Sequence, residues 1–261
     1  MPLRILLFVS LAASSAMAAP KDGNETYTGT AVSRRTAEFL YGEKHLLRYR
    51  DGHIAERVVL YTCRDGAPFA RKIVSYVDPL APDFHLTNAA SGQEEGIRTE
   101  SGGRKVFFRS DSQDTEKVGP LPRVEGLVAD AGFDEFVRSN WQRLMTDKAM
   151  QMPFLVPSRL DAYSFQVQHV RSGRFEGVPM EVFRLRLSGF WGWFLPGIDV
   201  YYGTDDRTLL YFDGLSNLRN ASGDNYLVRI TFSPLDRRPS DERSMNEARE
   251  AQLSPCRKSP N

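Results

Sequence analysis

The chain has 261 residues, a formal net charge of +1 and a hydrophobic content of 41%. This length and apolar content allow one β-rich domain with a sizeable buried core. The near-neutral charge, with no dense stripe of Lys or Arg, gives no field that would attract nucleic acid and excludes it as a partner.

Residues 1–18 have the pattern of a cleavable secretory signal peptide. Arg4 is the only charged residue among the first twenty, and a short apolar run, Ile5–Ala13, follows it. The small residues Ala16 and Ala18 fit the rule for cleavage before Ala19. The run is too short to span a membrane as a helix. We therefore expect a periplasmic protein cleaved near Ala18, with an uncleaved N-terminal anchor as the alternative.

The clearest predicted element is an antiparallel hairpin over residues 39–61. Its centre is Asp51-Gly52, which favours a type I′ turn because both central positions take positive φ. This turn predicts that Arg50 pairs with His53, Tyr49 with Ile54 and Leu47 with Glu56. The predicted apolar face consists of Tyr41, His45, Leu47, Tyr49, Ile54, Val58 and Leu60. The predicted polar face consists of Lys44, Arg48, Arg50, His53 and Arg57.

Residues 69–77 continue this meander, and residues 97–101 and 104–110 read as a second hairpin around Gly102-Gly103. Residues 111–131 are polar or rich in Pro and Gly, which is typical of a loop.

One segment has helical rather than strand periodicity. Its large residues recur at helical spacing: Phe133, Phe136, Val137, Asn140, Trp141, Leu144 and Met145. This spacing predicts one amphipathic helix of about four turns.

Alternating apolar and polar residues return after the helix, over residues 163–168, 183–187, 198–202, 208–212 and 226–232. Many strands with one apolar face must bury that face, and one helix cannot cover all of it. The predicted fold is therefore mainly β (α+β), a curled antiparallel sheet or half-barrel with one long amphipathic helix packed on its concave side.

The predicted domain spans residues 19–236, and residues 237–261 form a polar tail that we expect to be mobile, with at most a frayed helix after Ser240. The two cysteines, Cys63 and Cys256, can form a disulfide in an oxidising compartment, or they can remain separate thiols. A disulfide would tie the tail to the first hairpins.

No residue cluster matches a catalytic, metal or cofactor motif. The predicted hairpin places His45 and His53 on opposite faces, and the remaining histidines, His85 and His169, have no metal-ligand spacing. Ser216 lies in a Gly-x-Ser segment that lacks the final Gly of a nucleophile elbow, so it reads as a turn residue. An enzyme is accordingly the least favoured function class.

Residues 189–197 place five large apolar side chains between glycines. The segment is too short to span a membrane. It is interpreted as a corner packed into the core, as an aromatic flap at the mouth of a hydrophobic cavity, or as a patch that dips into a membrane surface.

Two blocks of the sequence resemble uncharacterised exported proteins of Gram-negative bacteria. One runs from Phe136 through Asn140-Trp141 and Phe154–Arg159 to Ser164-Phe165, and the other spans residues 198–203 and 209–217. The order of strands and helix in that group is similar to the half-barrel of the LolA/LolB-type lipoprotein carriers. The resemblance covers roughly residues 25–235 and implies an acyl-chain cavity under a helical lid. No functional residue of the carriers matches a position here.

The first hypothesis is therefore a non-enzymatic periplasmic protein that binds a lipid or acyl chain in an apolar cavity. The candidate cavity-wall residues are Phe165, Val167, Phe183, Leu185, Val200, Tyr202, Tyr226 and Val228. The candidate lid residues are Trp141, Trp191, Trp193 and Phe194.

The alternative is an envelope scaffold or protein-interaction protein with a filled core and no ligand. Its partner would be a membrane surface or an envelope protein. The candidate binding surface on the sheet's outer face consists of Arg48, Arg57, Arg184, Arg186 and Arg229.

Overall fold

The computed structural model describes residues 22–146, 148–189 and 197–256. The first series of strands is β1 (Gly23–Ser33), β2 (Phe39–Arg50), β3 (His53–Thr62), β4 (Pro68–Ser75), β5 (Asp83–Asn88), β6 (Gln93–Glu100), β7 (Gly103–Arg109) and β8 (Lys117–Pro120). The second is β9 (Met150–Val156), β10 (Asp161–Phe175), β11 (Val178–Leu187), β12 (Ile198–Gly203), β13 (Leu209–Arg219), β14 (Asn225–Thr231) and β15 (Arg238–Ser240). The helices are α1 (Gly132–Ser139), α2 (Trp141–Leu144), α3 (Glu242–Glu250) and the 3₁₀ turns η1 (Pro157–Arg159) and η3 (Pro234–Asp236).

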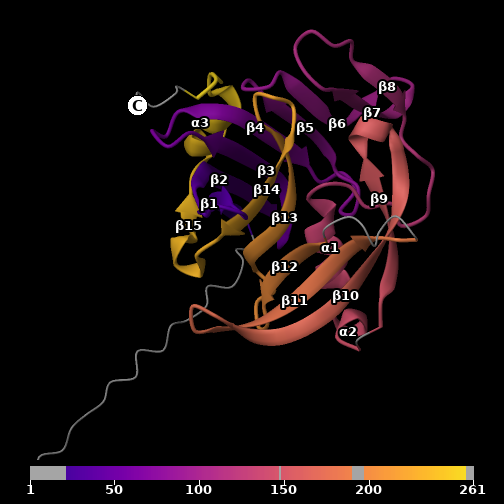
Figure 1. The fold of residues 1–261 in the computed structure, drawn as a ribbon, viewed down its shortest axis with the longest axis vertical. Coiled ribbons are helices and arrows are strands. Elements are labelled where there is room, and N and C mark those ends of the chain that lie inside the picture. The colour runs from indigo at the N-terminus through magenta and orange to yellow at the C-terminus, as the bar shows by residue number, and fades with distance from the viewer. Residues whose placement is uncertain (1–21, 147, 190–196, 257–261) are drawn as a thin grey trace, which may run out of the picture.

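All of these strands belong to one antiparallel sheet that curls on itself (Figure 1). Its order is β8-β7-β6-β5-β4-β3-β2-β1-β14-β13-β12-β11-β10-β9, so β1 and β14 join the two series, and β15 pairs with β1. The edge strands β8 and β9 form no ladder with each other; instead a bridge joins Val128 to Phe154, and η1 lies against β6 and β7. The predicted mainly β half-barrel is confirmed. No helix in the described ranges is long and apolar enough to cross a membrane.

The first hairpin has the predicted turn but not the predicted register throughout. Asp51 and Gly52 have φ values of +50° and +79°, as a type I′ turn requires, and Arg50 pairs with His53 and Tyr49 with Ile54. A bulge then shifts the pairing, so Leu47 faces Arg57 rather than Glu56.

That one-residue shift exchanges the two faces of β3, because successive strand residues point to opposite sides. Arg57 lines an internal cavity, which contradicts its predicted place on the outer polar face. Val58 and Leu60, predicted to face inward, pack instead with Leu46 in a separate cluster.

The predicted four-turn helix is divided into α1 and α2 at Asn140. The Asn140 side-chain amide donates to the carbonyl of Phe136 at 2.9 Å, and its backbone N–H donates to the same carbonyl at 3.1 Å. Ser139 Oγ also donates to the carbonyl of Glu135 at 2.7 Å. These side-chain bonds compete with regular helical bonding and end α1. Both helices still bury their apolar residues against the sheet, in a cluster that includes Phe136, Trp141 and Leu144.

The tail predicted to be mobile is instead packed on the outer side of the sheet as far as residue 256. β15 pairs with β1, and α3 lies against β2 and β3 (Figure 1). Met245 and Ala248 of α3 cover Leu46, Val58 and Leu60. The helix begins at Asp241, whose side chain accepts a hydrogen bond from the Ser244 N–H at 2.8 Å. A disulfide joins Cys256 to Cys63. The tail is therefore held on the sheet by the apolar face of α3 and by the disulfide. The high proportion of charged residues in the tail led to the prediction that it is mobile.

Candidate ligand-binding cavity

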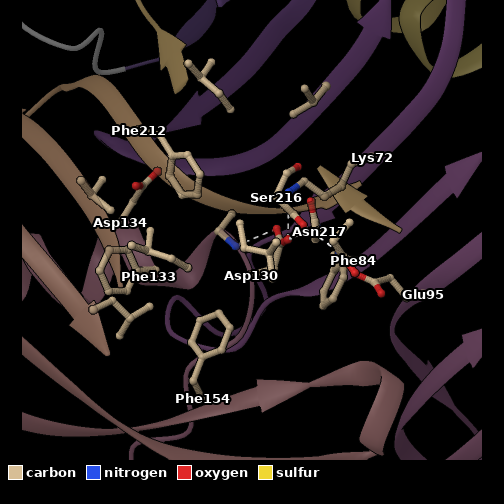
Figure 2. A pocket seen from close by; sticks show the side chains of 18 of the residues that line it. Lys72, Phe84, Glu95, Asp130, Phe133, Asp134, Phe154, Phe212, Ser216 and Asn217 are labelled. Atoms are coloured by element: carbon tan, nitrogen blue, oxygen red, sulfur yellow. Dashed lines mark hydrogen bonds and ion pairs between the residues drawn. The ribbon is translucent and has the colours of Figure 1, made fainter. Parts of the chain in front are cut away.

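The curled sheet encloses a cavity of about 480 Å³. Its two sides differ in chemistry, because β2–β6 contribute several charged side chains whereas β9–β13 contribute mainly apolar ones. In Figure 2, Lys72 and Glu95 lie on the right, Asp130 in the centre, Phe133 on the left and Phe154 below. A volume of this size is within the range of small-molecule binding sites.

The apolar side is formed by aromatic and aliphatic residues of the C-terminal strands and the start of α1. These residues are Phe133, Phe154, Leu155, Phe165, Leu185, Ile198, Val200, Leu209 and Phe212. Phe154 and Phe165 meet edge to face, with their ring centroids 5.7 Å apart. Transfer of a ligand's apolar chain from water to such a surface is favourable by about 0.8 kcal/mol per buried CH₂ group.

The register of the N-terminal strands explains the polar side. In one row across the sheet, His45 pairs with Val59, Val59 with Lys72, Lys72 with Leu86, and Leu86 with Glu95. Cross-strand partners share a face, so His45, Lys72 and Glu95 all point inward. Charged residues thus recur on the concave face, where simple alternation predicts apolar ones.

Most of these charges form buried pairs. Lys72 Nζ lies 2.8 Å from Asp130 Oδ1, and Arg57 Nη2 lies 3.2 Å from Asp134 Oδ2. Tyr202 donates its hydroxyl hydrogen to the other oxygen of Asp134 at 2.8 Å. Asp134 thereby connects α1 to β3 and β12, on the two sides of the cavity. Burial alone would raise the pKa of Asp134, but Arg57 and Arg138 outweigh it and hold that pKa below its ordinary value.

His45 and Glu43 form a third pair, with His45 Nε2 2.7 Å from Glu43 Oε2. Burial lowers the pKa of His45 despite this hydrogen bond, so the ring is neutral near pH 7. Its Nε2 then carries the hydrogen donated to Glu43, and Nδ1 is an acceptor, buried with no hydrogen-bond partner.

Glu95 differs from the other acids of the cavity. It is 7% exposed, and Gln93 donates to it at 3.2 Å, but no cation lies within ion-pair distance among the described residues. Burial, aided by the charge of Asp130, raises the pKa of Glu95 to about 7.

An irregular segment of β13 closes one end of the cavity. Pairing with β14 shifts between Leu215 and Arg219, so three residues lie opposite Tyr226 alone. The Gln93 amide donates to the Asn217 carbonyl at 2.9 Å and accepts from the Arg219 N–H at 3.2 Å. The bulge is thus fastened to β6 across the cavity, and Asn217 also donates to Asp130 at 3.2 Å (Figure 2).

The structure brings three of the predicted wall residues, Phe165, Leu185 and Val200, to the cavity. The remaining predicted wall residues are packed elsewhere: Val167, Phe183 and Tyr202 lie with Trp141 in the cluster under α1 and α2, and Tyr226 and Val228 belong to the core around β1 and β2. Of the predicted lid residues, Trp141 is buried in the cluster under α1 and α2 and does not line the cavity, and Trp191, Trp193 and Phe194 lie outside the described residues. A ligand-binding role for any of these residues stays a prediction.

The polar lining was not predicted: Arg57 was expected on the outer face, Asp134 on the polar side of the helix, and no role was expected for Lys72, Glu95 or Asp130. His45, Lys72 and Glu95 are far apart in the sequence and match no motif. Only the register of the strands places them in one row across the sheet. Within the described ranges, no group of three His, Cys, Asp or Glu side chains could hold a metal ion.

The proposed arginine surface is not a set of free cations. Arg48 pairs with Glu56 and Glu242, Arg184 with Asp199, and Arg229 with Asp213. Arg57 is buried, whereas Arg186 is exposed, and a binding role for this surface stays a prediction.

No protein-family model matches the chain, and no curated protein matches it. Among solved structures, it is similar to a β-barrel-like protein of a domain of unknown function, DUF1849, from Brucella abortus (TM-score 0.42, 10% identity, 86% of this chain and 100% of the other). It is also similar to a putative outer membrane lipoprotein-sorting protein domain from Vibrio parahaemolyticus (TM-score 0.33, 10% identity, 87% of this chain and 89% of the other). A third similar structure is a DUF1329 family protein from Desulfovibrio piger (TM-score 0.31, 10% identity, 85% of this chain and 88% of the other).

Proposed function

We propose that this protein binds a hydrophobic or amphiphilic ligand, such as a lipid or acyl chain, in the cavity of its half-barrel and acts by binding rather than by catalysis. The observation that carries the proposal is the cavity itself, about 480 Å³ in volume with one continuous apolar side. A filled-core scaffold has no need of such a space, because protein interiors normally pack with few voids larger than a water molecule.

The proposed location is the periplasm, after removal of residues 1–18. The signal pattern at the N-terminus supports this location. The Cys63–Cys256 disulfide also supports it, since structural disulfides persist in oxidising compartments. In the periplasm, a lipid or acyl-chain ligand would be available from a membrane or from an envelope protein.

Native mass spectrometry of the mature protein purified from the periplasm tests the proposal directly. We expect adducts whose masses match lipids and which disappear after organic extraction. Displacement of a fluorescent fatty-acid probe by those lipids would link the adducts to one site. A protein that carries no adduct and ignores the probe would contradict ligand binding.

Two adjacent leucines on β13 provide a matched test of whether the cavity is hollow. Leu209 lines the cavity, whereas Leu210 is 1% exposed and packs in a separate cluster with Met180 and Val182. Leu209→Trp should place its ring in open space, preserve the melting temperature and abolish probe binding. Leu210→Trp should overpack its cluster and lose about 1–3 kcal/mol of stability. Equal losses of stability, as followed by thermal unfolding, would show that the cavity is filled.

A further inference from the structure

Two charged groups of the cavity have no ionisable partner within ion-pair distance among the described residues. Acids and bases that line it are Glu43, His45, Arg57, Lys72, Glu95, Asp130, Asp134 and Arg219. Arg57 forms an ion pair with Asp134 and Lys72 with Asp130, and Glu43 accepts a hydrogen bond from the neutral His45 ring. Glu95 and Arg219 have no ion-pair partner among the described residues. Glu95 is buried and Arg219 is partly buried. A charge removed from water without a partner is costly, and a bound group of opposite charge would relieve that cost.

Glu95 and Arg219 lie at the same end of the cavity. The Gln93 side chain is hydrogen-bonded both to the Glu95 carboxylate and to the backbone N–H of Arg219. The Arg219 guanidinium lies over the ring of Phe108, 5.0 Å from its centroid, and Phe108 is the strand partner of Glu95. Its Nε atom is buried and has no hydrogen-bond partner.

Unsatisfied donors and acceptors accompany the two charges. Arg57 and His45 are 6% and 5% exposed, both line the cavity, and Arg57 Nε and His45 Nδ1 lack hydrogen-bond partners. Buried polar atoms are normally paired, so these unpaired atoms beside the cavity add to the uncompensated polarity of its lining.

We propose that Glu95 and Arg219 receive the head group of a zwitterionic amphiphile, with its primary ammonium on the Glu95 carboxylate and its phosphate on the Arg219 guanidinium. This inference rests on the proposed function. The ligand's chain lies against the apolar side formed by β9–β13. A purely anionic head group would leave Glu95 unpaired and lie near Asp130, and a purely cationic one would leave Arg219 unpaired. Only a head group with both charges satisfies both residues.

Competition against a fluorescent fatty-acid probe tests the inference with amphiphiles that share one acyl chain. We expect lysophosphatidylethanolamine to bind about tenfold more tightly than anionic lysophosphatidylglycerol or a cationic alkylamine, since each charge-assisted bond contributes on the order of a tenfold change in affinity. Glycerophosphoethanolamine, which has the head group without the chain, should not compete. This comparison separates a lipid source from a water-soluble one.

Two charge-neutralising variants assign the two ends of the head group. Glu95→Gln should weaken lysophosphatidylethanolamine about tenfold without weakening lysophosphatidylglycerol. Arg219→Gln should weaken both phosphate-bearing lipids and leave the alkylamine unchanged. The matched controls are Glu94→Gln, the next residue on β6, which pairs with Arg109, and Arg229→Gln, which pairs with Asp213. Neither control should change any affinity.

The pH dependence adds a readout that packing defects would not reproduce. Glu95 faces Asp130, Lys72, Arg219 and the Gln93 amide, and its pKa is raised to about 7. Binding of an ammonium requires ionised Glu95, so wild-type affinity for lysophosphatidylethanolamine should fall about tenfold from pH 8 to pH 6. Glu95→Gln should show no such fall. It should also fold, because a raised carboxyl pKa means that ionised Glu95 opposes folding above that pKa.

The outcomes separate this inference from the proposed function. If neither the probe nor any amphiphile binds wild type, ligand binding itself is wrong. If all amphiphiles bind wild type with equal affinity, or if Glu95→Gln and Arg219→Gln change nothing, the cavity binds chains and the head-group assignment is overturned.

Discussion

Asp134→Asn is expected to lower the free energy of unfolding by about 3–5 kcal/mol, the usual loss when one partner of a buried ion pair is removed. The Asp134 carboxylate accepts from Arg57 at 3.2 Å and from Tyr202 at 2.8 Å, joining α1 to strands on both sides of the cavity. Asparagine keeps the shape but removes the charge, so Arg57 would remain buried without a counterion. Urea denaturation at pH 7 measures the loss from the midpoint and slope.

The control for Asp134→Asn is Glu116→Gln, which neutralises a bidentate surface pair with Arg98. That pair is partly exposed, so its loss should be less than about 1 kcal/mol. Combining Asp134→Asn with Arg57→Met should restore part of the stability, because it removes the orphaned cation. Equal effects of Asp134→Asn and Glu116→Gln would contradict the structural role given to Asp134.

The same contact predicts how acid affects the fold. Asp134 has a folded-state pKa below its ordinary value, so its stabilising contribution is present above the unfolded pKa of about 3.9 and is lost as the pH falls through the folded value. The stability difference between wild type and Asp134→Asn should therefore narrow on acidification below about pH 4. A constant difference down to pH 2 would show that the Asp134 carboxylate contributes no charge interaction.

The architecture was predictable from local patterns because apolar and polar residues alternate with a period of two within most of the strands. Alternation over residues 183–187 and 226–232 predicted β11 and β14, and Asp51-Gly52 predicted the turn that joins β2 to β3. β1 was not predicted, although it joins the two series of strands. Its sequence, rich in Thr and Gly, has few large apolar residues, so its period is weak.

The polar side of the cavity was not predictable, since it depends on register rather than composition. The bulge next to Arg48 turns Arg57 inward, and nothing in the sequence marks where a strand gains a residue. The partners of the buried charges are also distant, as with Arg57 and Asp134, which are 77 residues apart. Such pairs form only when the sheet curls and brings distant residues together. The alternation of apolar and polar residues therefore predicts that these charged side chains face solvent.

Loss of the Cys63–Cys256 disulfide is expected to lower stability by about 2–5 kcal/mol, with the upper end favoured by the 193-residue separation that the bond closes. The bond fastens the segment after α3, and backbone contact there is sparse: Ser254 donates to the Pro68 carbonyl at 3.1 Å. Without it, α3 should detach more often and expose Leu46 and Val58. The loss should therefore begin locally, on the outer face, before the half-barrel unfolds.

Cys256→Ser is the better variant for this test, because Cys256 is exposed whereas Cys63 is buried and a serine there would also bury a hydroxyl. Wild type treated with a reducing agent should match Cys256→Ser, and the agent should not change the variant further. Hydrogen exchange should quicken first in α3, while amides of β11 and β12 keep their protection. Since those strands carry much of the apolar cavity side, probe affinity should survive at temperatures below the unfolding transition. A variant as stable as wild type, with α3 amides equally protected, would show that the apolar contacts of Met245 and Ala248 hold the helix without the bond.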